Sequence, residues 1–314
     1  MAQENSTALP ARGRVLFVFV DGIGVAEASA HNPFSLASTP AFEELLGGRL
    51  VASTPTFAER DHVYRHLDAR LGVPGLPQSA TGQTALFAGA NGAAALGRHV
   101  TAFPGATLQA LIREGSLFLR AQEGGLRWVF ANVRTKFYFE ALAERRLRRS
   151  VTAWAVEAAG GAYRDERDLL AGRAVSWDIV RDRIDLESDA PPITASEAGR
   201  HLGRLCEDSD LVVYETFLTD FAGHRRFGLD PVEVVERVDG LLAGVIESLP
   251  GDITLVLTSD HGNLEDLSTK GHTAAPVPLL ARGPGAAHFS EAEGLLDVYP
   301  GVLRCLGLDA RVAG

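Results

Sequence analysis

The sequence predicts an α/β protein whose mostly parallel sheet is covered by helices on both faces. Short apolar runs alternate with helical stretches along much of the 314-residue chain, as in folds that link parallel strands by crossover helices. The first run, residues 15–20, contains only Val, Leu and Phe, which is typical of a central strand buried on both faces. With 46% hydrophobic residues, the chain can form a large core. We therefore expect three layers, α/β/α.

Polar and glycine residues mark the limits of the later elements. Thr39 and Pro40 begin a predicted helix that ends before Gly47, because helices favour an early proline and a terminal glycine. Further helices are predicted at 107–123, 195–206, 231–249 and 295–306, and further strands at 127–133, 210–215, 255–260 and 276–281.

The alternation of strands and helices stops between residues 134 and 192, a stretch rich in arginine. We interpret 134–192 as a small, mainly helical insert that lies over the sheet edge as a lid. A basic run is usually a solvated surface, but in a chain of net charge −10 it is also a place for anion-binding arginines. The flanks, 13–133 and 193–314, would then form the core domain, and the polar residues 1–12 a disordered tail.

Composition limits the partners and the compartment. A net charge of −10 and a pI near 5.4 do not favour binding to nucleic acid or to an anionic membrane. Cys206 and Cys305 lie in apolar helical stretches, so buried free thiols are expected. The apolar run 15–20 is too short to span a membrane, and the N-terminus lacks the apolar core of a signal peptide. We expect a soluble cytoplasmic protein and leave self-association, as a homo-oligomer, open.

Carboxylates and imidazoles follow several of the predicted strands. They are Asp21, Asp220, His224, Asp260, His261 and His272. Each has an ordinary explanation alone, such as a turn aspartate or a surface histidine. Together they would lie at one edge of the sheet, because ligands bind outside the carboxyl ends of strands in open α/β sheets. Nitrogen and oxygen ligands without thiolate suit two divalent cations such as Mn²⁺ or Zn²⁺.

Two hydroxyl groups, those of Ser79 and Thr81, precede or begin a further predicted helix. The free N–H groups and the positive dipole at a helix N-terminus favour a phosphate or a developing alkoxide. Either residue alone is better explained as a helix cap. A hydroxyl bound to one of two metals becomes a nucleophile near neutral pH.

The motifs that carry these residues resemble one known superfamily. They are Asp21-Gly22-Ile23-Gly24, the loop around Ser79, Asp220-x-x-x-His224, Thr258-Ser259-Asp260-His261-Gly262-Asn263 and Gly271-His272-Thr273. Their order and spacing are similar to the alkaline phosphatase superfamily, in particular to the metalloenzyme branch of cofactor-independent phosphoglycerate mutase and phosphopentomutase. The resemblance covers residues 14–130 and 195–308 and implies an alkaline phosphatase-like metal-binding core.

The resemblance also implies the role of each residue. One metal would be bound by Asp220, His224 and His272, and the other by Asp21, Asp260, His261 and the nucleophile oxygen. In the superfamily the nucleophile lies ten residues before a glycine that ends the following helix, and counting back from Gly89 gives Ser79. Thr81 is the second candidate. The mutase-like branch points to manganese, and alkaline phosphatase points to zinc.

The expected activity is that of a two-metal phosphohydrolase that acts on a small phosphomonoester through a phosphoserine. Two alternatives stay open: a phosphomutase of the phosphoglycerate or phosphopentose type, and a metal-binding protein without turnover. The mutases of this branch that act on phosphoglycerate carry an insert far longer than 134–192. Arg134, Lys136 and Arg225 are the candidates for binding the substrate.

Overall fold

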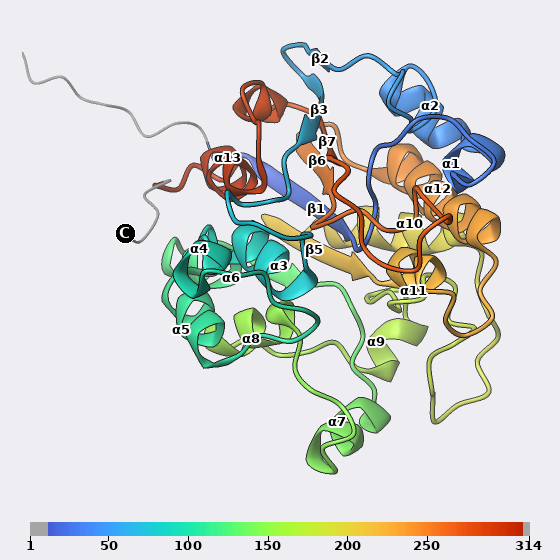
Figure 1. The fold of residues 1–314 in the computed structure, drawn as a ribbon. Coiled ribbons are helices and arrows are strands. Elements are labelled where there is room, and N and C mark those ends of the chain that lie inside the picture. Colours follow the sequence, from blue (N-terminus) through green and yellow to red (C-terminus); the bar gives the residue numbers. More distant parts are fainter. Residues whose placement is uncertain (1–11, 310–314) are drawn as a thin grey trace, which may run out of the picture.

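A computed structural model describes residues 12–309, which form a seven-stranded sheet between two layers of helices (Figure 1). The strands are β1 (Arg14–Val20), β2 (Phe57–Ala58), β3 (His62–Leu67), β4 (Trp128–Phe130), β5 (Leu211–Thr216), β6 (Ile253–Thr258) and β7 (Val277–Arg282), in the order β2-β3-β7-β6-β1-β5-β4. Strands β6, β1, β5 and β4 are parallel, whereas β7, β3 and β2 pair antiparallel. The α/β/α prediction is confirmed, with a mixed sheet whose antiparallel strands form one edge.

The alternation of side chains along β1 divides the core in two. Val15, Phe17 and Phe19 contact one apolar cluster, and the residues between them contact the other. The first cluster includes residues of α3 (Ser79–Ala88), α4 (Gly92–Leu96), α5 (Ala106–Gly115), α6 (Leu117–Glu123), α8 (Val151–Ala158) and α13 (Val298–Cys305). The second includes residues of α1 (Pro33–Leu36), α2 (Pro40–Leu46), α10 (Ala195–Leu205), α11 (Leu218–Gly223) and α12 (Pro231–Ser248).

Several predicted elements differ in detail from the structure, and the strand expected at 127–133 is shortened to β4. The helix expected at 107–123 is two helices, because Ser116 is extended (φ −64°, ψ 154°) and its hydroxyl accepts the N–H of Leu119 at 3.3 Å to cap α6. The last helix begins with a 3₁₀ turn, η2 (Leu295–Asp297), before α13. The strand expected at 276–281 is the antiparallel β7.

Part of the arginine-rich stretch 134–192 packs into the core beside the sheet. It contains α7 (Lys136–Ala143), α8 and α9 (Glu166–Leu170), of 8, 8 and 5 residues, and is otherwise irregular. Val151, Ala155 and Val156 of α8 are buried in the same cluster as α3 and α5, so α8 belongs to the helical layer of the core. The helix α7 projects from the body of the molecule (Figure 1).

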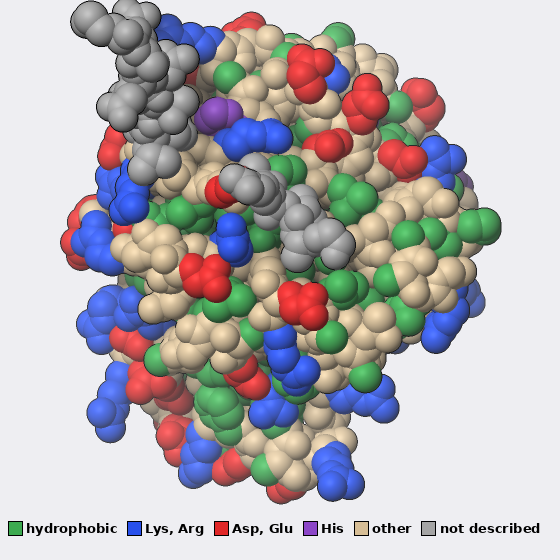
Figure 2. Space-filling model, turned by 90° about the vertical axis from the view of Figure 1, so that its left-hand side faces the viewer, with side chains coloured by type: hydrophobic (Ala, Val, Ile, Leu, Met, Phe, Trp, Pro, Cys, Tyr) green, Lys and Arg blue, Asp and Glu red, His purple; other side chains and the backbone are tan. Residues whose placement is uncertain are grey.

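Other expectations concern the surface and the ends of the chain. Cys206 and Cys305 are buried free thiols, as predicted. Within residues 12–309, no helix has the length and apolarity needed to cross a membrane. Acidic and basic side chains are interspersed on the face shown in Figure 2. Of the tail predicted at 1–12, only Arg12 lies among the described residues.

Candidate metal centre

Three neighbouring parallel strands deliver most of the predicted ligands to one edge of the sheet. Asp21 follows β1 directly, Asp220 lies on α11 just after β5, and Asp260 comes two residues after the end of β6. Because β6, β1 and β5 are adjacent and parallel, their carboxyl ends meet at this edge, where open α/β sheets place their sites. His272 reaches the same edge from the loop between β6 and β7.

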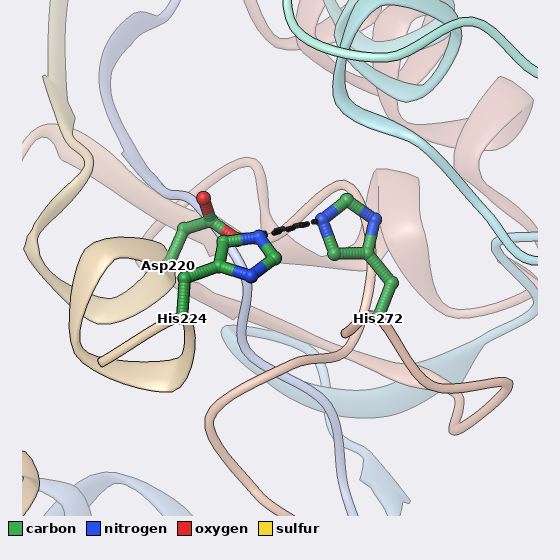
Figure 3. Close-up of side chains that lie close together, drawn as sticks. All are labelled: Asp220, His224 and His272. Atoms are coloured by element: carbon green, nitrogen blue, oxygen red, sulfur yellow. Dashed lines mark hydrogen bonds and ion pairs between the residues drawn. The ribbon is translucent and has the colours of Figure 1, made fainter. Parts of the chain in front are cut away.

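Asp220, His224 and His272 form the first of two clusters of groups that could hold a metal ion, and Figure 3 shows the two imidazole rings turned toward each other. Their Nε2 atoms are 3.2 Å apart, and Nε2 of His224 is 3.3 Å from Oδ1 of Asp220. His224 Nδ1 donates to the Lys270 carbonyl at 3.3 Å, and His272 Nδ1 donates to the Pro77 carbonyl at 2.9 Å. In the neutral rings, both Nε2 lone pairs therefore face the cluster, as in metal-ligating histidines.

Asp21, Asp260 and His261 form the second cluster, and all three are buried. Nε2 of His261 lies 3.2 Å from Oδ1 of Asp21 and 3.6 Å from Oδ2 of Asp260. Its Nδ1 donates to the carbonyl of Gly262 at 3.3 Å, so Nε2 of this ring also points at the carboxylates. The ring stacks on His272 with centroids 3.7 Å apart, which makes the two clusters adjacent.

The charges in this site are poorly balanced by the protein alone. Burial raises the pKa of Asp21, and the neighbouring Asp260 raises it further. Burial opposes the charged form of His261, but the carboxylates of Asp260 and Asp21 raise its pKa to about 10. Burial and the charge of His261 lower the pKa of His272 to about 4. Carboxylates gathered around converging Nε2 atoms fit a divalent cation in each cluster.

Ser79 is the first residue of α3, and its side chain lies beside the second cluster. Its Oγ is 3.0 Å from Nε2 of His261. Ser79 also lines a cavity of about 420 Å³ together with Asp21 and Asp220, which belong to different clusters. This hydroxyl therefore lies beside the second cluster, at a cavity that residues of both clusters line.

Thr81, the second candidate nucleophile, has a different environment. Its side chain is fully buried, and its hydroxyl donates to the carbonyl of Gln78 at 3.0 Å and lies 3.4 Å from Nδ1 of His99. It does not line the cavity that contains Ser79. The geometry thus favours Ser79.

Gln83 is a polar residue of the site that the sequence did not single out. It lies one helical turn after Ser79 and donates through Nε2 to Asp21 at 3.0 Å and to Asp260 at 3.1 Å. The amide thereby holds two carboxylates that would otherwise repel each other. Its spacing of four residues from Ser79 places both on one helix face, and this spacing is the pattern that would have identified it.

Asn263 and Glu265 support the first cluster from the loop after β6. Asn263 Nδ2 donates to Oδ1 of Asp220 at 2.6 Å. Glu265 is buried and accepts the backbone N–H groups of Asn263 at 2.7 Å and Gly24 at 2.8 Å. These bonds fix the loop after β1 to the loop after β6, which orients the ligands as outer-shell partners do in metal sites.

Comparison with known proteins agrees with this arrangement. Residues 190–310 match the model of a family described as the metalloenzyme superfamily. The chain resembles the metalloenzyme branch of the alkaline phosphatase superfamily. The 2,3-bisphosphoglycerate-independent phosphoglycerate mutase of Vibrio vulnificus is 27% identical over 154 residues, which are 46% of this chain and 29% of that protein. The chain thus spans less than a third of the length of this relative.

Solved structures show that the fold is alkaline phosphatase-like. The alkaline phosphatase of the Antarctic bacterium TAB5 superposes with a TM-score of 0.54 at 13% identity, over 95% of this chain and 99% of that one. The phosphoglycerate mutase of Leishmania mexicana gives a TM-score of 0.51 at 13% identity, over 97% of each chain.

Three residues, Arg134, Lys136 and Arg225, were predicted to bind the substrate. Of these, only Arg134 lines the cavity that contains Ser79. Lys136 is exposed and pairs with Glu187 at 3.1 Å. Arg225 donates to the carbonyl of Leu267 at 2.8 Å instead. Two other arginines, Arg148 and Arg226, line the cavity.

Arg134 is held rigidly in the wall of the cavity. It is 7% exposed, and its Nη2 donates to Oε1 of the buried Glu215 at 2.9 Å. Thr152 donates to the other Glu215 oxygen at 2.6 Å. The guanidinium lies 5.0 Å from the ring centroid of Phe130 and 4.9 Å from that of Tyr138. Its buried Nε has no hydrogen-bond partner within residues 12–309.

Replacing Arg134 with methionine is expected to destabilise the protein by about 3–5 kcal/mol, because Glu215 would be left as a buried acid without its partner. The free energy of unfolding in urea measures this change. Arg146→Met is the matched control, since Arg146 lies in the same stretch and pairs with Glu144 on the surface, where such a pair contributes at most about 1 kcal/mol. Equal losses in both variants would contradict the structural role of the buried pair.

Proposed function

We propose that the chain is a two-metal-dependent phosphohydrolase that acts on a small phosphomonoester through a phosphoserine at Ser79. The observation that carries this proposal is the position of the Ser79 hydroxyl, 3.0 Å from Nε2 of His261 and in one cavity with Asp21 and Asp220. The matching relative is named a phosphoglycerate mutase, and the fold is shared with an alkaline phosphatase. Both comparisons support phosphoryl transfer as the type of chemistry.

The two ligand clusters would each hold one divalent ion, Mn²⁺ or Zn²⁺. Asp220, His224 and His272 would hold one, and Asp21, Asp260 and His261, with the oxygen of Ser79, the other. When bound, the ions would lower the pKa of the serine hydroxyl and offset charge on the phosphoryl oxygens. The Nδ1–H bonds of the three histidines to backbone carbonyls keep their Nε2 atoms oriented for this task.

Ser79 begins α3, a helix of ten residues, and its oxygen would attack phosphorus. The serine hydroxyl gives up its proton to solvent and a new Oγ–P bond forms while the ester O–P bond breaks. The leaving alkoxide takes a proton from solvent and departs as the alcohol. The free N–H groups at the start of the helix favour the negatively charged phosphoryl group. Arg134, which lines the same cavity, would bind one of its oxygens. Water then cleaves the phosphoserine and releases inorganic phosphate.

A phosphomutase is the second candidate, favoured by the names of the curated relatives. In that case Ser79 would return the phosphoryl group to another hydroxyl of the same molecule. The two functions differ in their products and not in their first step. A cavity that admits water favours release of phosphate, whereas retention of the bound alcohol favours isomerisation.

Product analysis decides between these functions. The purified chain is loaded with Mn²⁺ or Zn²⁺ and incubated with a panel of phosphomonoesters, and the products are followed by phosphorus NMR. We expect inorganic phosphate in amounts equal to the alcohol released. An isomeric phosphate ester without free phosphate would establish the mutase instead. A chain that binds metal but converts no member of the panel would contradict both functions and support a metal-binding protein without turnover.

A further inference from the structure

The cavity above Ser79 has an unusual lining for a site that acts on a small hydrophilic phosphate. Its floor is polar and contains Ser79, Gln83, Asp21 and Asp220. Its walls are largely aromatic, and the aromatic residues that line it are Phe103, Tyr138, Trp177, Phe217, Phe221 and Phe227. A cavity with a few convergent polar groups and apolar walls is typical of sites for organic ligands.

We propose that the substrate is a phosphate monoester whose alcohol carries an aromatic ring or a similar flat apolar group. This inference rests on the proposed function, because it places the phosphoryl group at Ser79. It goes further by assigning the alcohol to a wall formed by Trp177, Phe217, Phe221 and Phe227, here called the aromatic wall.

The rings of the aromatic wall contact one another in sequence. Trp177 and Phe221 lie edge to face with centroids 5.6 Å apart, and Phe221 and Phe227 do the same at 5.1 Å. Phe217 lies 6.4 Å from Phe221. Phe221 directly follows Asp220 in the chain, so the wall begins beside the first metal cluster. A ring bound against it would be close to a phosphoryl group at Ser79.

These rings are not simply part of the core. None of the four is fully buried, and Phe227 is 63% exposed. Phe227 also has a φ of 57°, a left-handed conformation that is an outlier for a bulky residue. Large apolar side chains that are gathered in a cavity often mark a ligand-binding surface, whereas apolar side chains scattered singly on the surface need no such explanation. An unfavourable backbone conformation at such a place is typical of a functional site.

The charged groups of the cavity determine where the phosphoryl end lies. Arg134 is buried and lines the same cavity as Ser79. Arg148 and Arg226 are exposed, and they bring positive charge to the cavity of an acidic protein. The cavity measures about 420 Å³, within the usual range for a drug-sized ligand, which is about 300–1,000 Å³. Glycerate alone would leave the aromatic wall in water.

Two substrates with matched leaving groups test the inference. 2-Phenylethyl phosphate and ethyl phosphate both release a primary alcohol, so their difference in kcat/KM reports binding of the ring rather than chemical reactivity. We expect kcat/KM of the metal-loaded protein to be higher for the phenylethyl ester by a factor of about 10 or more, as burial of an aromatic ring permits.

Single substitutions locate the effect on the aromatic wall. Trp177→Ala and Phe227→Ala are each expected to reduce the ratio of the two kcat/KM values toward unity. Phe227 is mostly exposed, so its removal leaves the core intact even if Trp177→Ala fails to fold. Phe139→Ala is the matched control, because Phe139 is an exposed aromatic residue of α7 that does not line the cavity. It should leave the ratio unchanged.

Binding of two phosphonates, which cannot be hydrolysed, separates this inference from the proposed function. Calorimetry of the metal-loaded chain should show tighter binding of 2-phenylethylphosphonate than of ethylphosphonate. Equal turnover of the two esters would leave the phosphohydrolase standing and overturn the aromatic substrate class. Tighter binding of the phenyl compound without any turnover would support the aromatic site and contradict the hydrolase. Equal binding without turnover would overturn both.

Discussion

Replacing Ser79 with alanine is expected to lower kcat by about a thousandfold or more, as loss of a nucleophile does in other covalent mechanisms. The hydroxyl lies 3.0 Å from Nε2 of His261 and lines the cavity. Among residues 12–309, no other hydroxyl that lines this cavity is bonded to a predicted ligand side chain. Alanine keeps the helix start, so folding and the two ligand clusters should persist. The loss is measured as the steady-state rate at which inorganic phosphate is released from a phosphomonoester.

The control for this variant is Thr81→Val, which removes the competing hydroxyl but keeps the shape of the side chain. Because Thr81 is bonded to Gln78 and lies outside the cavity, turnover should fall far less than in Ser79→Ala. Acid quenching followed by mass spectrometry should find the phosphoryl group on Ser79 in the wild type. Phosphate found on Thr81, or full activity of Ser79→Ala, would refute the assignment of the nucleophile.

The gathering of the candidate ligands at one edge was predictable because the sheet supplies a geometric rule. Asp21, Asp220 and Asp260 each follow a buried parallel strand, and the carboxyl ends of adjacent parallel strands meet at one edge. The spacing of Asp220 and His224 then needs only one helical turn, which α11 provides. Buried runs and a helical period are local features of sequence, so neither inference required knowledge of tertiary packing.

The cavity residues were harder to predict, because their positions depend on irregular backbone. Arg225 and Phe227 both have positive φ, 55° and 57°, so helical spacing no longer applies after α11. As a result Arg226, and not Arg225, lines the cavity. The stretch 134–192 posed the same difficulty. Its arginines suggested a lid, whereas the apolar residues of α8 pack in the main core, a contact that only the folded chain brings about.

Removal of single ligands is expected to remove single metal ions. His224→Ala should leave the second cluster intact and lower the metal content of the protein from two equivalents to one, with a loss of activity of about 100-fold or more. Asp260→Asn should instead remove the ion of the second cluster and leave that of the first, because Asp260 lies in the cluster beside Ser79. His288→Ala, an exposed histidine outside both clusters, should keep both ions. Elemental analysis after dialysis measures each content.

Chelation of both ions should in turn lower the thermal stability of the wild-type chain. Burial and mutual repulsion raise the pKa of Asp21, so its ionised form is unfavourable until a cation joins the cluster. A ligand that binds only the folded state stabilises it by about 2.7 kcal/mol at about 100 times its dissociation constant. We expect the Tm to fall in chelator and to recover on addition of Mn²⁺ or Zn²⁺, with a smaller recovery in His224→Ala. A Tm that does not respond to metal in the wild type would count against both clusters as metal sites, since their charges would then be satisfied by the protein alone.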